Sequence, residues 1–122
     1  MAVSIAQPKD LEMIHPTASF KDNLKLLPTT ENLTRIDLLD AKGDVVASIE
    51  NQPGKQGSLA VYNYLHLHFG DITADAAKHG LDVFAEHTID AKSRPGAHPN
   101  IDLLFEILTM GKVLHVGLQV SN

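Results

Sequence analysis

The chain has 122 residues, of which 43% are hydrophobic and 20% carry charge, so it can bury one core and carries too few charges for a disordered chain. It contains no cysteine, which excludes disulfides, thiolate chemistry and iron–sulfur clusters. Fifteen acidic residues against ten basic ones give a formal net charge of −5. That charge argues against a nucleic-acid partner, because phosphate backbones are bound by basic surfaces.

The sequence also lacks the marks of a secreted or membrane protein. The N-terminus shows no basic region followed by an apolar one, as a signal peptide would. No apolar run approaches the ~20 residues that a membrane-spanning helix needs. We therefore expect a cytoplasmic protein with no membrane partner.

The N-terminal residues 1–16 have weak periodicity and contain two prolines, so we interpret them as an arm. Alternation of Val3 and Ile5 could add an edge strand to a sheet. Residues 17–122 are expected to form one α+β domain.

The next elements are a short helix and a hairpin. Ser19 is placed to cap the helix, and Pro28 to end it. Two strand-like runs then flank a short loop, in which Gly43 can take the left-handed conformation of a tight turn. The pattern predicts a β-hairpin over about 34–50.

The segment 58–69 is compatible with both a strand and a helix. As a strand, it would place His66 and His68 on one face, where paired histidines can bind a metal. As a helix, it would be capped by Ser58 and ended by Gly70, and the two histidines would lie about 200° apart. We favour the helix, because β-branched residues are nearly absent from this segment.

The remaining elements are two helices and a strand. Thr73 can cap a long helix running to about Ser93, and a further helix follows the break at 94–99 and stops at Gly111. Alternating residues then predict a strand over about 112–120. Strands and helices are segregated, so we predict an α+β fold: a small antiparallel sheet, made of the hairpin and the C-terminal strand, packed against three to four helices.

Two stretches resemble a family of small bacterial proteins of unknown function. They are PGKQGSLAVYN at 53–63, and FAEHTIDA at 84–91 followed by RPGAHPNID at 94–102. The resemblance runs from about Phe20 onward and leaves the arm outside. It implies a bacterial source and a single domain, and it brings no catalytic residue with it.

The segment 86–102 holds the densest group of side chains suited to catalysis or metal binding. His87 and Asp90 lie three residues apart, so a helix would place them on one face, with Asp90 orienting His87 as a catalytic general base. If the Pro-Gly corner at 95–96 folds back, imidazoles and carboxylates could also meet around a divalent transition metal. The metal ligands expected on that basis are Glu86, His98 and Asp102.

These residues also have an ordinary structural explanation. Exposed helix faces commonly carry Glu, His and Asp, and Asp102 in a first helical turn is favoured by the helix dipole. Their spacing matches no recognised metal-binding motif.

The glycine-rich turn 53–58 is a second candidate site. It precedes a predicted helix and could offer backbone N–H groups to a small anionic ligand. Its spacing is not that of a nucleotide-binding Walker A loop. Lys55, from this turn, or Arg94 could also hold an anionic group at the His/carboxylate site around 86–102.

Two functions follow from these observations. The first is a small metal- or ligand-dependent enzyme, or a ligand-binding protein, with a His/carboxylate site around 86–102 that converges on one pocket. The second is a non-catalytic interaction or regulatory domain acting as a homodimer or other homo-oligomer, through the edge of strand 112–120 or an apolar helix face. This second hypothesis expects the candidate residues of 86–102 to lie scattered in solvent.

Overall fold

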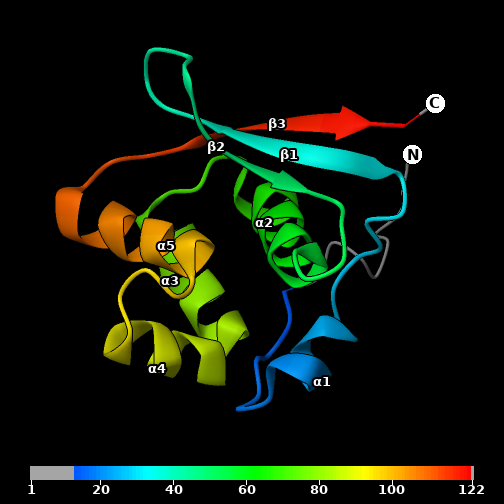
Figure 1. The fold of residues 1–122 in the computed structure, drawn as a ribbon, viewed down its shortest axis with the longest axis vertical. Helices are drawn as coiled ribbons and strands as arrows, with labels where there is room; N and C mark the ends of the chain where they lie inside the picture. Colours follow the sequence, from blue (N-terminus) through cyan, green and yellow to red (C-terminus); the bar gives the residue numbers. More distant parts are fainter. Residues whose placement is uncertain (1–12, 122) are drawn as a thin grey trace, which may run out of the picture.

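The computed structural model describes residues 13–121, so most of the arm predicted over 1–16, including Val3 and Ile5, lies outside the described residues. A sheet lies on one side of the molecule and the helices gather on its other side (Figure 1). The elements in chain order are α1 (Phe20–Leu24), β1 (Leu33–Leu39), β2 (Val45–Glu50), α2 (Gln56–Phe69), α3 (Ala74–Phe84), α4 (Glu86–Ser93), α5 (Pro99–Met110) and β3 (His115–Val120). This architecture confirms the predicted α+β fold. No helix within 13–121 is long and apolar enough to span a membrane.

The sheet has three antiparallel strands in the order β2-β1-β3. Its central strand places Ile36 opposite Ile49 and Leu118, and these side chains belong to the core or pack against it. Asp37, the next residue along, points to the opposite face because side chains alternate along a strand. One face of the sheet is therefore covered by helices, as expected.

The predicted strand boundaries are close to the observed ones. The hairpin predicted over 34–50 is formed by β1 and β2, and Gly43 in its turn has φ +87°. The C-terminal strand predicted over 112–120 begins later, at His115. Leu114, just before it, makes a separate antiparallel bridge to Ile72.

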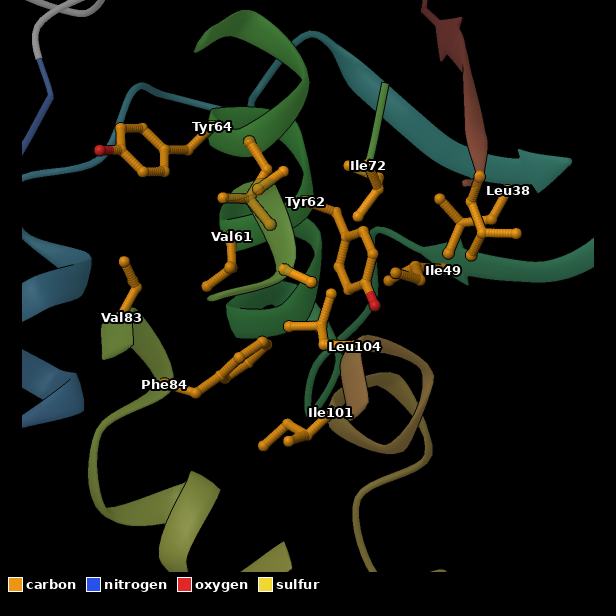
Figure 2. Packing of buried hydrophobic residues seen from close by; sticks show 14 of the residues in the cluster. Leu38, Ile49, Val61, Tyr62, Tyr64, Ile72, Val83, Phe84, Ile101 and Leu104 are labelled. Carbon is orange, nitrogen blue, oxygen red and sulfur yellow. The ribbon is translucent and has the colours of Figure 1, made fainter. Parts of the chain in front are cut away.

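Helix α2 is the centre of the core, which confirms the helical interpretation of 58–69. It starts earlier than predicted, with Lys55 rather than Ser58 as its N-cap. Tyr62 points between Ile49 and Leu104 (Figure 2). Its buried hydroxyl donates a 2.6 Å hydrogen bond to the carbonyl of Asn100, which ties α2 to the start of α5.

The single helix predicted over 73–93 is wrong, because the chain breaks at Ala85 into α3 and α4. Ala85 has φ +53°, a conformation that costs a non-glycine residue roughly 1–3 kcal/mol. Long-range packing stabilises the break: the ring of Phe84 stacks on Phe20 at 5.3 Å between centroids. The Thr88 hydroxyl donates to the carbonyl of Leu81, near the end of α3. The break reorients the chain, so that α4 runs along the side of the molecule far from the sheet (Figure 1).

Candidate functional site

A cleft of about 790 Å³ lies where α1, the starts of α2, α4 and α5, and strand β2 come together. Its volume is in the range typical of small-molecule sites. The walls come from α1, from Ser48 of β2, from 54–58, from the junction of α3 and α4, and from 97–101. No element builds this cleft alone, so its position depends on the tertiary fold.

The cleft brings together residues from both segments that the sequence singled out. Lys55 comes from the glycine-rich turn before α2, His87 from the first turn of α4, and His98 from the turn before α5. The other candidates are not part of its lining. They are Glu86, Asp90, Arg94 and Asp102.

His87 and His98 lie side by side, with 5.5 Å between their ring centroids. The Pro-Gly corner therefore folds back as expected, and Gly96 there has φ +92°. His87 also meets the ring of Phe20 edge-on, at 5.0 Å between centroids. The two imidazoles and the phenyl ring form one continuous part of the cleft lining.

Asp90 holds His98 rather than His87, so the predicted pair of Asp90 and His87 is wrong. The Oδ2 atom of Asp90 lies 2.7 Å from Nε2 of His98. The side chain of Asp90 is 37% exposed and that of His98 is 25% exposed, so solvent reaches the pair in part. The error arose because helical spacing ignores the turn after Ser93, where α4 ends.

Arg94 is engaged by the same carboxylate. Its Nε and Nη2 atoms donate to both oxygens of Asp90 in a fork-like pair. Hydrogen bonds from Arg94 and then from His98 hold the pKa of Asp90 well below its ordinary value of 3.8, so the carboxylate stays charged at neutral pH. The guanidinium expected to bind a ligand therefore braces Asp90 instead.

The metal ligands predicted from the sequence are not assembled. The Glu86 carboxylate accepts a 2.8 Å hydrogen bond from the N–H of Phe20, and this bond is the main cause that lowers the pKa of Glu86. The Asp102 carboxylate accepts a 3.0 Å bond from the N–H of Gly96. Both acids therefore fix the backbone around the cleft. Across residues 13–121 there is no group of three or more His, Asp or Glu side chains able to hold a metal ion.

The electrostatics of the cleft favour an anion. The N-cap of α2 is Lys55, no side chain caps the helix, and its first turn contains no acidic residue. The free N–H groups of a helix start carry a partial positive charge. Lys55 adds a full positive charge at the same place, and the imidazole of His98 is part of the same lining.

A second group of histidines lies elsewhere, and sequence reasoning missed it. The Tyr64 hydroxyl lies 2.7 Å from Nε2 of His79 and accepts a 2.9 Å hydrogen bond from the N–H of Ile14. The ring of His68 packs against Tyr64 at 4.8 Å between centroids. We call Tyr64, His68 and His79 the closed cluster. Their proximity depends on the packing of α2 against α3, which the sequence alone does not show.

The fold and the cleft define a small α+β protein whose cavity is lined by histidines and a lysine. Residues 20–118 match the model of a family described as "Uncharacterized protein conserved in bacteria (DUF2322)". The chain belongs to this family, as its resemblance predicted. No curated protein and no solved structure matches it. The matched range includes every residue that lines the cleft.

Proposed function

We propose that this protein binds a small organic anion in the cleft. The observation that carries the proposal is the convergence of Lys55, the uncapped start of α2 and His98 on one cavity of about 790 Å³. Lys55 and the start of α2 favour negative charge, and His98 can donate a hydrogen bond to an anion. The net charge of the chain is −5, so the positive charge at Lys55 and the start of α2 is opposite in sign to the charge of the whole protein.

The ligand should also have an apolar part. Phe20, Leu24 and Phe84 form one wall of the cleft, and Ile101 adds to the lining. Small-molecule sites commonly combine apolar walls with a few polar groups that set orientation. A carboxylate or phosphate attached to an apolar body satisfies both parts of this lining.

The pairing of Asp90 with His98 favours a second candidate function, general acid–base catalysis on the bound ligand. A charged carboxylate at Nε2 keeps the proton on that nitrogen and leaves Nδ1 as the basic atom. Histidine held in this way is the commonest general base. His87 lies in the cleft beside it but has no carboxylate partner of this kind within residues 13–121.

Isothermal titration calorimetry with benzoate, phenyl phosphate and benzyl alcohol tests the binding proposal. The two anions should bind the intact chain and benzyl alcohol should not. Lys55→Ala should weaken binding of the anions by about tenfold or more, because it removes a charged partner. Lys42→Ala, a change of an exposed lysine in the hairpin turn, is the matched control and should bind like the intact chain.

Equal binding of both anions to Lys55→Ala and to the intact chain would contradict the proposal. Self-association of the chain stays a separate prediction, and analytical ultracentrifugation over a range of concentrations tests it. A sedimentation coefficient that does not change with concentration and fits one chain would contradict that prediction.

A further inference from the structure

We infer that the anionic group bound in the cleft is the C-terminal carboxylate of an extended peptide, which adds as a strand to the outer edge of β2. This inference rests on the proposed function and names its ligand class. Its distinguishing observation is that the cleft is bounded by an edge strand as well as by helices. Ser48 of β2 lies in the cleft lining together with Lys55.

The register of the sheet fixes where the backbone groups of Ser48 point. The N–H of Asn51 donates to the carbonyl of Thr34, so these two residues form a hydrogen-bonded pair. Such pairs alternate along an antiparallel ladder. The pair of Asp37 and Ser48 lies three residues further along the ladder from the pair of Thr34 and Asn51. Three is an odd number, so Asp37 and Ser48 form a non-hydrogen-bonded pair. The N–H and C=O of Ser48 therefore point away from β1.

The outer edge of β2 is open at this point. β2 has β1 as its only neighbour in the sheet formed by residues 13–121. The hydroxyl of Ser48 donates a 2.7 Å hydrogen bond to the carboxylate of Asp37, on the face of the sheet opposite to Ile36 and Ile49, so it does not block the edge. An edge strand with free N–H and C=O groups is a template for an added strand. The cleft thus offers strand-type backbone bonding that a simple organic acid would leave unused.

The charged groups suit the end of such a peptide. Lys55 and the start of α2 follow β2 after a short turn, in which Gly54 has φ +88°. Backbone N–H groups at such a turn and helix start capture terminal carboxylates in other peptide-binding sites. The apolar wall of Phe20 and Leu24 can then receive a peptide side chain. A neutral, amidated terminus would lose the charged part of this recognition.

The test is an ¹H–¹⁵N correlation NMR titration of the full chain with a mixture of random pentapeptides bearing free C-terminal carboxylates. The same mixture with amidated C-termini is the matched control. The inference predicts shifts of the amide signals of Ser48 and of residues 56–58 with the free acids. Amidation should raise the concentration needed for half of the shift by about tenfold or more.

A backbone variant tests the edge itself. Ser48→Pro removes the outward N–H, and edge strands tolerate proline, so peptide affinity should fall. Lys42→Ala, a change in the hairpin turn outside the cleft lining, is the control and should bind like the intact chain. If Ser48→Pro does not fold, the comparison of free and amidated peptides on the intact chain still decides.

The outcomes separate this inference from the proposed function. Benzoate binding without any response to free-acid peptides would overturn the inference alone. Equal responses to the free and amidated mixtures, or shifts that leave Ser48 unmoved, would overturn it as well. If the intact chain responds to neither benzoate nor the peptides, both the inference and the proposed function would be overturned.

Discussion

The two histidine groups of this protein use the same residue type in opposite ways. His87 and His98 line a cleft of about 790 Å³. His68 and His79 lie under Tyr64, where the chain segment at Met13 and Ile14 closes over the hydroxyl. The first group faces a space that a ligand can enter, whereas the second group faces other parts of the protein.

The difference shows that clustering of histidines does not by itself define a site. In the closed cluster, the Tyr64 hydroxyl is already bonded to Ile14 and His79, so it serves to tie α2, α3 and the preceding segment together. In the cleft, Asp90 holds one nitrogen of His98. We therefore assign a structural role to the closed cluster and a ligand-facing role to the cleft pair.

The largest expected effect concerns affinity for the ligand. His98→Gln should weaken binding of phenyl phosphate by about tenfold, because it removes an imidazole that can carry charge toward the anion. His68→Gln changes the closed cluster and should leave the affinity unchanged. Calorimetry on the two variants measures both effects, and a larger loss in His68→Gln would reverse the assignment of roles.

The next effect concerns stability. Tyr64→Phe should lower the free energy of unfolding by about 1–2 kcal/mol, because it leaves the N–H of Ile14 and the Nε2 of His79 without their partner. Binding of phenyl phosphate should not change. Urea denaturation followed by circular dichroism measures the first quantity. A loss of ligand affinity at unchanged stability would show that the closed cluster takes part in binding.

As the pH falls, the free energy of unfolding should decrease first through the closed cluster and only at lower pH through Asp90. Burial lowers the pKa of His79 below its ordinary value of 6.5, despite the opposing charge of Asp82 and with a further lowering from His68. The unfolded chain then binds more protons than the folded one just below pH 6.5, so stability falls as the pH drops through that window. The protein should therefore begin to lose the stability contributed by the closed cluster as the pH falls below 6.5.

Asp90 titrates in a different window. The pKa of the Asp90 carboxylate is lowered in the folded protein. Its contribution to the free energy of unfolding is therefore present above pH 3.8 and is lost only as the pH falls below 3.8. Urea denaturation at pH 7.5, 5.5 and about 3 separates the two groups, because only the last value lies in the window of Asp90. His79→Gln should flatten the decrease between pH 7.5 and 5.5, and Asp90→Asn should not. An unchanged slope in His79→Gln would contradict the role given to its burial.

The smallest expected effect concerns the break that positions His87. Ala85→Gly should stabilise the protein by about 0.5 kcal/mol, because relief of the positive φ outweighs the entropy lost by glycine. Ala60→Gly, within α2, is the control and should destabilise by about 1 kcal/mol. Destabilisation by both variants would contradict a strained junction between α3 and α4.

Local patterns in the sequence accounted for most of the fold. The hairpin follows from two alternating runs around Gly43, and the end of α5 follows from Gly111, which has φ +68°. The break at Ala85 has no glycine or proline to mark it. It depends on Phe84 meeting Phe20 across the tertiary fold. The need for glycine at position 80 also comes from tertiary packing. A Cβ atom added to Gly80 would lie within about 3 Å of side chains of α2 and α5, and no local pattern in the sequence indicates this contact.

The candidate site was predictable only in part. The Pro-Gly corner pointed to a fold-back, and His87 and His98 do meet. The partner of Asp90 was missed, since spacing along a helix favours His87 whereas the turn after α4 brings His98 to the carboxylate. Lys55 was expected to serve the same site as the histidines, but the packing that brings them together was not predictable from local patterns. The two segments are more than thirty residues apart and meet only because α2 packs beside the start of α5.

The most direct test of the ligand-facing role is NMR of the imidazole side chains during titration with phenyl phosphate. We predict that the ring signals of His87 and His98 shift, because both rings line the cleft that the anion enters. The ring signals of His68 and His79 should stay in place. Shifts confined to His68 and His79, or no shift of His98 at saturating phenyl phosphate, would contradict the account.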